Sequence, residues 1–291
     1  MIQSPHEAPG SVLAFVLGGG GAKGALQVGA LRALFESGLV PDLLVGTSVG
    51  AVNASFLAVR GCSLEAIDAL EDAWHDAAAQ DLLPDNYLWL TVRALFNRRG
   101  PDVADRLHRF FVSHGLDPGL RFRDLAGPRL ILVAADLWAG TTILFGTSPD
   151  HLILDGVLAS TAIPPWVRPR DQGDRLVMDG GAISNLPIEP ALSQGATEII
   201  ALDLTDPRPI GPAMRGFGPF LFQLIHTVEQ RQVYLEKQLA AAYRVPVHHV
   251  PLQAAMPVAV WQFERCLPLI DRGYDLMDEY LRLHPGLLAR P

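Results

Sequence analysis

A serine between two glycines is the strongest chemical signal in the sequence. Ser48 lies in the run Gly46-Thr47-Ser48-Val49-Gly50, after the apolar run 43–45 and before the small residues 51–55. Such a sharp turn from a strand into a helix exposes the serine hydroxyl, and the glycines leave room for the tight backbone. The turn also brings the Val49 N–H and the positive end of the next helix near a reacting carbonyl. The pattern predicts a nucleophile for acyl transfer, although an ordinary strand-to-helix turn can look the same.

A glycine-rich loop precedes this turn in the chain. Gly18 to Gly21 follow the apolar run 12–17, and Ala22 and Lys23 lead from them to Gly24. Successive glycines can align their N–H groups into a concavity that binds an anion at a helix start. A nucleotide-binding P-loop needs Ser or Thr after Gly-Lys, and a dinucleotide site needs an acid after the second strand. Neither is present, which favours an oxyanion as the bound group, held at the carboxyl edge of the sheet beside Ser48.

An aspartate with glycine neighbours is the third candidate. Asp179 follows the short apolar run 176–178, and Gly180 and Gly181 come directly after it. A carboxylate at a strand end, where glycines allow another loop to approach closely, could act as a general base. Asp-Gly is also a common turn signal, so the motif is weak when taken alone.

The elements that must position these residues alternate between strands and helices. The first sixty residues indicate strand, glycine loop, helix, strand, turn and helix, which predicts an α/β fold of three layers: a mainly parallel central sheet with helices on both faces. No linker or repeat is evident, so residues 1–291 are expected to form one domain, with the motifs in 12–206 and a helical part in 207–291. Gly38 and Ser63 are predicted to cap helices. The expected strands are 12–17, 43–45, 129–137, 141–145, 176–178, 198–202 and 245–251, and the expected helices are 22–37, 51–59, 63–79, 86–97, 103–113, 220–244 and 263–283.

Composition excludes several classes of protein. Hydrophobic residues make up 49% of the chain and charged residues 19%, which is typical of a globular protein. A net charge of −8 without a Lys/Arg run argues against a nucleic-acid partner and against attraction to anionic membranes. No signal peptide or transmembrane helix is predicted, so a cytoplasmic location is expected. Cys62 and Cys266 form no CxxC pair, and we expect two reduced thiols and no zinc site.

In order and spacing, the motifs resemble those of the patatin-like phospholipase family. The resemblance covers about residues 12–206 and implies a serine acyl hydrolase that cleaves carboxylic ester bonds of lipids, phospholipids or lysophospholipids, through a Ser–Asp dyad and an acyl-enzyme. It implies Ser48 as nucleophile and Asp179 as base, with no metal ion or cofactor. Because a free aspartate has a pKa of about 3.9, such a base needs contact with Ser48 and a site with little water. The resemblance rests on Gly19 to Gly24, Gly46 to Gly50, Ala135 to Leu137 with Gly140, Ala159 to Pro164, Asp179 to Gly181 and Asn185 to Pro187.

By the same resemblance, the N–H groups of Gly19, Gly20 and Gly21, together with Val49, hold the oxyanion. Lys23 is harder to place. It could hold the glycine loop, meet a lipid phosphate or lie in solvent.

Two alternatives stay open. A conventional α/β-hydrolase triad also uses GxSxG, and His226, His248 and His249 follow Asp179 in the required order. The chain could also be a non-catalytic module that binds a nucleotide or an acyl group at the glycine loop.

The segment 207–225 has two interpretations. Residues 207–219 are rich in proline and glycine and are predicted as a loop, and apolar residues are frequent from Phe217 on. It either leads into a core helix or forms a lid over the site. Contact with a membrane or micelle, if made, is expected to be peripheral and to involve 217–222. Head group, acyl length and oligomeric state are not predicted.

Overall fold

Eight strands form one sheet in the part of the chain that the computed structural model describes, residues 10–80, 82–83, 103–164, 166–204 and 217–288. Most of the central strands are continuous apolar runs, as expected for strands that are buried on both faces. The strands are β1 (Leu13–Leu17), β2 (Leu43–Thr47), β3 (Arg129–Asp136), β4 (Thr141–Phe145), β5 (Arg170–Asp171), β6 (Leu176–Asp179), β7 (Glu198–Asp203) and β8 (Val247–Pro251).

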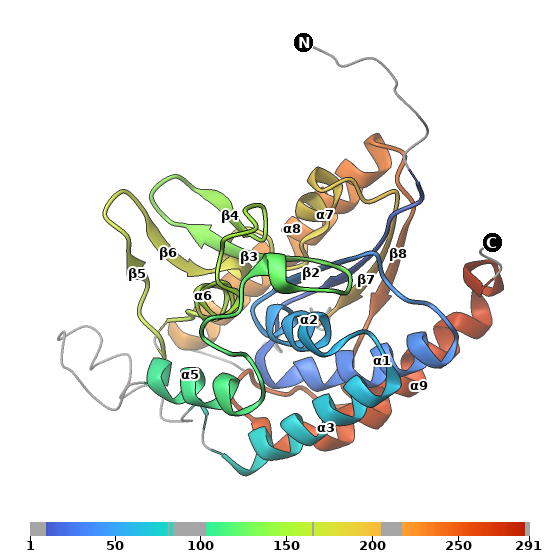
Figure 1. Ribbon diagram of the computed structural model, residues 1–291, viewed down its shortest axis with the longest axis horizontal. Coiled ribbons are helices and arrows are strands. Elements are labelled where there is room, and N and C mark those ends of the chain that lie inside the picture. The colour runs from blue at the N-terminus through green and yellow to red at the C-terminus, as the bar shows by residue number, and fades with distance from the viewer. Residues whose placement is uncertain (1–9, 81, 84–102, 165, 205–216, 289–291) are drawn as a thin grey trace.

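The strand order is β5-β6-β3-β2-β1-β7-β8, and β4 also pairs with β3 (Figure 1). β1 lies in the centre and pairs in parallel with β2 and β7, while β2–β3 and β7–β8 are parallel too. β4 and β6 are antiparallel to β3. The sheet is therefore mainly parallel, as the sequence predicts, with an antiparallel extension at one side.

Helices connect the strands largely where periodicity predicts them. Gly38 has a φ of 78° after the first helix, and Ser63 Oγ accepts the Ala66 N–H at 3.2 Å, which confirms both predicted caps. The predicted helix 22–37 is divided, because a 3-10 turn, η1 (Gly21–Gly24), precedes the α-helix. The predicted helix 86–97 and residues 207–216 of the predicted loop 207–219 lie outside the described residues. Residues 217–219 were also predicted as loop, but they form the first turn of α8. The described α-helices are α1 (Ala25–Glu36), α2 (Val49–Arg60), α3 (Leu64–Ala79), α5 (Val103–Ser113), α6 (Ile153–Ser160), α7 (Ile188–Ser193), α8 (Phe217–Ala242) and α9 (Leu267–Leu283).

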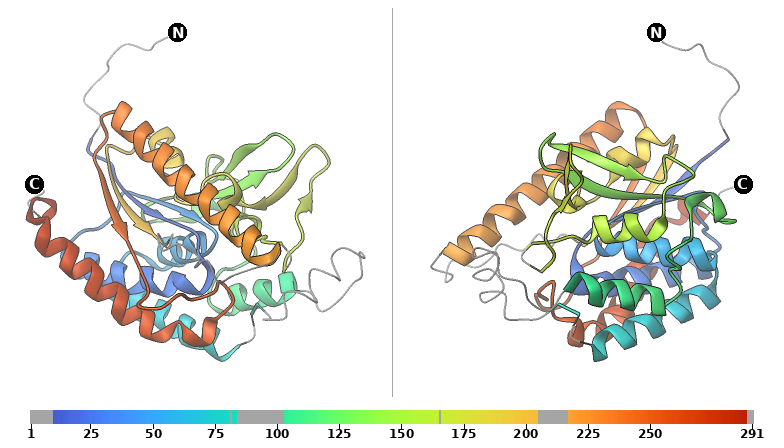
Figure 2. Two further views of the ribbon diagram at one scale, coloured as in Figure 1. Left: turned by 180° about the vertical axis from the view of Figure 1, so that it is seen from behind. Right: turned by 60° about the vertical axis from the view of Figure 1, so that its left-hand side comes forward.

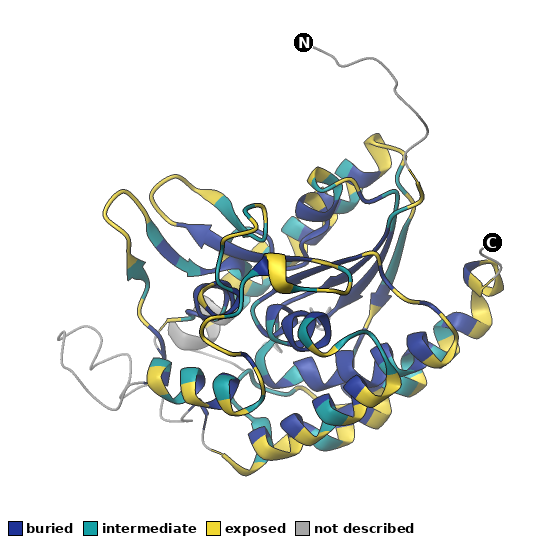
Figure 3. Cartoon of the chain, viewed as in Figure 1, coloured by how far each residue is buried: buried dark blue, intermediate teal, exposed yellow. Residues whose placement is uncertain are grey.

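The helices form a layer on each face of the sheet. Leu13, Phe15 and Leu17 of β1 belong to one core cluster, which includes residues of α1, α2, α3 and α9. Ala14 and Val16 belong to the other, which includes residues of α7 and α8. Figure 2 shows α8 on one side of the sheet and α1 with α9 on the other, and Figure 3 shows the sheet as the most buried layer. This is the three-layer α/β architecture that the sequence predicts.

Helices α1 and α9 cross closely because each has a glycine at the crossing. A methyl group on Gly29 would overlap the Ile270 carbonyl, and one on Gly273 would overlap the Leu26 carbonyl. The two helices lie side by side along one face (Figure 2). Since α1 begins where the glycine loop ends, α9 supports the helix that follows this loop.

We predict that Gly29→Ala lowers the free energy of unfolding by about 1–3 kcal/mol, because the added methyl group forces α1 and α9 apart. Urea unfolding measures the loss. Gly286→Ala is the control, since nothing lies within 4 Å of a methyl group there, and its effect should stay within about 0.5 kcal/mol. Equal stability of the Gly29→Ala protein and the wild type would mean that the close crossing is not a tight constraint.

Candidate active site

Strands β2 and β6 bring the predicted nucleophile and base together. β2 runs parallel to β3 and ends with Thr47 beside Val133. β6 runs in the opposite direction and ends with Asp179 beside Ala134, the next residue of β3. The two carboxyl ends therefore meet head to head along β3. Ser48 follows one end at once, and Asp179 is the last residue of the other.

Ser48 has the strained backbone of a sharp turn. Its φ of 56° and ψ of −125° lie in a region that side chains other than glycine rarely adopt. The neighbouring glycine is needed for packing, since a side chain on Gly50 would overlap the Leu17 carbonyl at the end of β1. Ser48 is half-buried and directly precedes α2, so its hydroxyl lies at the positive end of a helix. The predicted turn at Gly46 to Gly50 is confirmed as a local structure.

Two further hydroxyl groups hold this turn in place. The Ser48 N–H donates to Ser160 Oγ at 2.9 Å, and Ser160 Oγ donates to the Val133 carbonyl at 2.6 Å. Thr47 Oγ1 donates to the Ser184 carbonyl at 2.9 Å. Ser160 thus ties the turn to β3, and Thr47 ties it to the loop that follows Asp179.

The Asp179 carboxyl group is buried, with 4% of the residue exposed. Its Oδ1 accepts the Gly181 N–H at 2.8 Å, whereas Oδ2 makes no hydrogen bond among the described residues. Burial raises its pKa to about 6, although the Gly181 N–H and the nearby Ser48 hydroxyl act in the opposite direction. A carboxylate with this pKa and a free oxygen is a stronger base than an aspartate in water. Gly180 and Gly181 form the start of the turn η3 (Gly180–Ala182).

The glycine loop lies beside Ser48, because Leu17 at the end of β1 pairs with Gly46 of β2. The Gly19 N–H donates to the Asn185 carbonyl at 3.0 Å, so this group is already engaged. Gly21 and Val49 are the first residues of η1 and α2, where N–H groups have no partner inside the helix. Gly20 and Gly21 are partly exposed.

Lys23 holds the glycine loop to the end of the neighbouring strand. Its Nζ donates to the Leu204 carbonyl at 2.6 Å, just beyond β7. Of the three roles considered for Lys23, this contact favours the first, in which the side chain fixes the loop. Gly24 ends η1 and is buried against Val49 and Trp74.

Helix α8 packs over the loop that follows Asp179. Glu236, with 8% of the residue exposed, accepts the Ser184 hydroxyl at 2.6 Å and the Glu189 N–H at 2.9 Å. Burial raises the pKa of Glu236 to about 7. Gln232 donates to the Ala182 carbonyl at 3.0 Å. No pattern in the sequence links these residues, because Ser184 and Glu236 are 52 positions apart.

Another carboxyl group of α8 faces the site. Burial raises the pKa of Glu229, as do the negative charges of Asp203 and Asp179, while Lys23 lowers it. Glu229 therefore lies within electrostatic reach of both the predicted base and the loop-holding lysine.

Two of the three histidines considered for a triad have other partners. His248 and His249 lie on β8, three strands away from β2 in the sheet. His248 Nε2 is 2.8 Å from Glu198 Oε1, and His249 Nε2 is 2.8 Å from Asp203 Oδ2. The structure does not bring either ring to Asp179.

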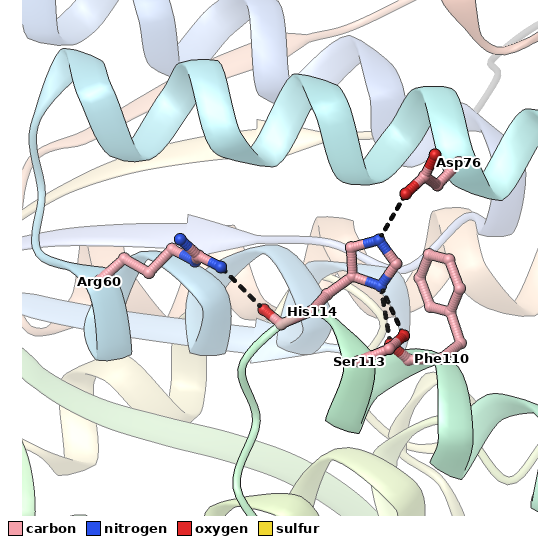
Figure 4. A network of polar contacts seen from close by, with 5 residues as sticks. All are labelled: Arg60, Asp76, Phe110, Ser113 and His114. Carbon is pink, nitrogen blue, oxygen red and sulfur yellow. Dashed lines mark hydrogen bonds and ion pairs between the residues drawn. The ribbon is translucent and has the colours of Figure 1, made fainter.

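A second grouping of serine, histidine and aspartate lies at the end of α5 (Figure 4). His114 Nε2 is 3.1 Å from Asp76 Oδ2, and Nδ1 is 2.8 Å from the Phe110 carbonyl and 3.2 Å from Ser113 Oγ. Since a carbonyl only accepts, Nδ1 donates to it, and the Ser113 hydroxyl donates to the same carbonyl at 2.9 Å. Nδ1 therefore cannot take a proton from Ser113. These contacts stabilise the C-terminal end of α5 and connect it to α3.

The two cysteines form neither a disulfide nor a metal site in the described part of the chain. Cys62 and Cys266 are free thiols, and burial raises their pKa values to about 12 and about 11. In the residues that the structure describes, no group of three His, Cys, Asp or Glu side chains is arranged to hold a metal ion.

We predict that the buried Asp179 carboxylate lowers the stability of the folded state at neutral pH. Its folded pKa of about 6 lies above the ordinary 3.8, so its stabilising contribution is present below the ordinary value and is lost as pH rises through about 6. Asp179→Asn removes the charge and keeps an acceptor for the Gly181 N–H. The free energy of unfolding should rise by on the order of 2 kcal/mol at pH 8 and by much less at pH 5, as measured in urea.

Asp136→Asn is the matched control, because Asp136 is also buried at a strand end. Its Oδ1 accepts the N–H groups of Trp138 and Ala139 at 3.0 and 3.3 Å. This variant should not become more stable than the wild type as pH rises. An Asp179→Asn protein with no extra stability at pH 8 would contradict the presence of a desolvated carboxylate.

Known proteins with similar sequences match the part of the chain that contains these motifs. Residues 15–192 match the family model described as patatin-like phospholipase. The chain is 31% identical over 214 residues to patatin-like phospholipase domain-containing protein 7 of Mus musculus, which covers 72% of this chain and 15% of that protein. It is 33% identical over 210 residues to an uncharacterised NTE family protein of Mycobacterium tuberculosis, covering 72% of this chain and 32% of that protein. The chain thus spans about a third or less of the length of these curated relatives.

Solved structures with similar folds share less sequence. VipD from Legionella pneumophila is 15% identical with a TM-score of 0.47, covering 95% of this chain and 68% of that one. The ExoU–SpcU complex of Pseudomonas aeruginosa gives 19% identity and a TM-score of 0.43, with 94% and 52% covered. Because the family model matches more than half of its residues, the chain belongs to the patatin-like phospholipase family.

Proposed function

We propose that the protein is a serine acyl hydrolase that cleaves carboxylic ester bonds of lipids, with phospholipids or lysophospholipids as substrates. The observation that carries the proposal is the buried Asp179 carboxylate, with Oδ2 unpaired among the described residues, beside the half-buried Ser48 and the glycine loop. Family membership supports a lipid ester as the substrate.

In the first half of the proposed reaction, Ser48 becomes acylated. Asp179 Oδ2 takes the hydroxyl proton as Ser48 Oγ bonds to the ester carbonyl carbon, and the carbonyl oxygen becomes an oxyanion. The bond to the leaving alcohol then breaks, and that alcohol takes the proton from Asp179. The products are the free alcohol and an ester between Ser48 and the acyl group.

In the second half, water replaces the alcohol. Asp179 takes a proton from water as the water oxygen bonds to the acyl carbon. The bond to Ser48 Oγ breaks, and Oγ regains a proton from Asp179. A fatty acid is released and the starting state returns, so no metal ion or cofactor is needed in either half.

The proposed oxyanion donors are the N–H groups of Gly20, Gly21 and Val49. Gly21 and Val49 begin helices, so the helix dipoles act in the same direction as the hydrogen bonds. The family resemblance also implies Gly19 as a donor, but its N–H donates to the Asn185 carbonyl. We therefore propose that Gly19 shapes the loop. Each donor is expected to be worth about a hundredfold or more in rate.

A Ser–Asp dyad is favoured over a triad with His248 or His249. His248 and His249 pair with Glu198 and Asp203, and Asp179 is held by the Gly181 N–H. The buried position of Asp179 supplies the raised pKa that a histidine would otherwise bring.

Fatty-acid release from phospholipid and lysophospholipid micelles tests the proposal. The wild type is expected to release fatty acid in the presence of a chelator, and Ser48→Ala should lower the rate at least about a thousandfold, because the nucleophile is lost. The double variant His248→Ala with His249→Ala is the control and should keep most of the activity. If it loses as much activity as Ser48→Ala, the triad is correct and the dyad is wrong.

The same assay should show an acid limb. Since Asp179 acts as a base only when ionised, kcat/KM should fall about tenfold per pH unit below pH 6.

Labelling of Ser48 by a fluorophosphonate tests the remaining alternative, a non-catalytic binding module. A folded wild-type protein that neither labels nor hydrolyses any ester would be a binding module.

We also propose that the enzyme meets a lipid surface peripherally, through the first turns of α8. Phe220 is 62% exposed, and Leu224, Ile225 and Val228 are each exposed by 46–48%. Among the described helices, none combines the length and the hydrophobicity of a membrane-spanning segment. The structure does not describe residues 205–216 or the side chains of Phe217 and Phe222, so the lid interpretation stays a prediction.

Phe220→Ser with Leu224→Ser is expected to reduce partitioning onto zwitterionic vesicles severalfold, because less apolar surface enters the lipid. Sedimentation with liposomes measures it. Tyr243→Ser, a 68% exposed aromatic just beyond the other end of α8, is the control and should partition like the wild type. Unchanged partitioning of the double variant would remove α8 as the contact.

A further inference from the structure

Three polar side chains form a chain of hydrogen bonds inside the core. Trp74 Nε1 donates to Asn53 Oδ1 at 3.1 Å, and Asn53 Nδ2 donates to Gln27 Oε1 at 3.0 Å. Gln27 and Asn53 are fully buried, and Trp74 is 5% exposed. Trp74, Asn53 and Gln27 come from α3, α2 and α1, so this series of hydrogen bonds connects three helices of one layer.

The chain of hydrogen bonds ends on the two ends of the glycine loop. Gln27 Nε2 donates to the Gly18 carbonyl at 2.8 Å, at the start of the loop. Asn53 Nδ2 donates to the Gly24 carbonyl at 3.1 Å, at its end. Gln27 Nε2 also lies 3.3 Å from the Leu202 carbonyl in β7. Both amide nitrogens therefore use both of their hydrogens: Gln27 Nε2 donates to the Gly18 and Leu202 carbonyls, and Asn53 Nδ2 donates to the Gly24 carbonyl and to Gln27 Oε1.

The first of these bonds fixes a peptide unit next to the proposed oxyanion donors. The peptide that joins Gly18 to Gly19 is planar, so its C=O and N–H point in opposite directions. Gln27 holds the C=O, and the Asn185 carbonyl holds the N–H at 3.0 Å. With this unit held from both sides, the chain enters Gly20 in one direction only.

A loop of this composition needs such support. Five of the seven residues from 18 to 24 are glycine, which has more backbone freedom than any other residue. Oxyanion donors act only if they are already in position when charge develops, and a misplacement of about 1 Å can cost on the order of a hundredfold in rate. Buried amides are costly unless every hydrogen bond is made, so a network this complete is a rigid support.

We propose that Gln27, Asn53 and Trp74 are positioning residues that hold both ends of the glycine loop and so aim the Gly20 and Gly21 N–H groups at the oxyanion. This inference rests on the proposed function for its catalytic consequence. None of the three side chains touches the reacting atoms. Gln27 and Asn53 act through the loop backbone, and Trp74 acts through Asn53.

Gln27→Met tests the proposal, because methionine keeps the length of the side chain and removes the amide. We expect kcat for ester hydrolysis to fall about 10- to 100-fold, because the Gly20 and Gly21 N–H groups are no longer held in position. KM should stay within about twofold, because no contact with the substrate is removed. Amide hydrogen exchange of residues 18–24 should become faster. Trp74→Phe, which keeps a ring against Phe263 and removes only the indole N–H, should give a smaller change in the same direction.

Val28→Ala is the matched control. Val28 is the next residue of α1, is fully buried and belongs to the apolar core cluster. It should lower the melting temperature without a change in kcat or in exchange of residues 18–24. If Gln27→Met lowers the melting temperature like this control and leaves kcat and exchange unchanged, the network is merely structural and the proposal is wrong.

The two readouts separate this proposal from the proposed function. If the wild type hydrolyses no ester, the proposed function fails, and hydrogen exchange in the glycine loop still decides whether the network holds it. If Gln27→Met does not fold, Trp74→Phe decides. Unchanged exchange in a folded Trp74→Phe protein, with unchanged kcat, would then overturn the inference.

Discussion

Strands β2 and β6 pair with successive parts of the same edge of β3. The point where the two strands meet determines where Ser48 and Asp179 lie. Thr47 takes the place beside Val133 and Asp179 takes the next one, beside Ala134. A slip of one residue in either pairing would move a chain end by about 3.3 Å and turn its side chains to the other face. The distance from base to nucleophile is therefore a property of the sheet register. The hydroxyls of Thr47 and Ser160 cross-link the elements whose register matters.

This arrangement lowers stability at several points. Ser48 has a backbone conformation that costs on the order of 1–3 kcal/mol, and Asp179 has a carboxylate taken out of water. The glycine loop adds conformational entropy that folding must overcome. The two larger apolar core clusters, one on each face of the sheet, offset these costs. The close crossing of α1 and α9 and the contacts of Glu236 hold the two outer layers in place.

Local patterns predicted the elements next to the motifs, because short apolar runs, glycines and caps are local signals. Gly38 and Ser63 are examples. The antiparallel pairing of β6 with β3 could not be predicted from such patterns, because the partner and direction of a strand depend on distant residues. Helices α6 and α7 were missed because eight and six residues are too few for a clear helical period.

The same limit applies within the site. A run of glycines indicates an anion site but does not say which N–H is engaged by the protein itself, and Gly19 proved to be bonded to Asn185. Ser48 was evident from its own turn, whereas Asp179 needed the resemblance to a family. Gln27, Asn53 and Glu236 each act through partners on other elements, so single positions carried no signal of their roles.

The central place of β1 has a consequence for how the chain reaches its native state. Val12, next to β1, bonds to Thr197 across 185 residues, and β8 and α9 complete the edge and one outer layer later still. At synthesis rates of about 5–20 residues per second, β1 waits roughly ten to forty seconds for its partner β7 to be made. Pairing over such separations is slow, and the waiting strand is apolar along its whole length. The nascent chain is thus exposed to aggregation during this interval, and its yield in cells should depend on chaperones more than its final stability suggests.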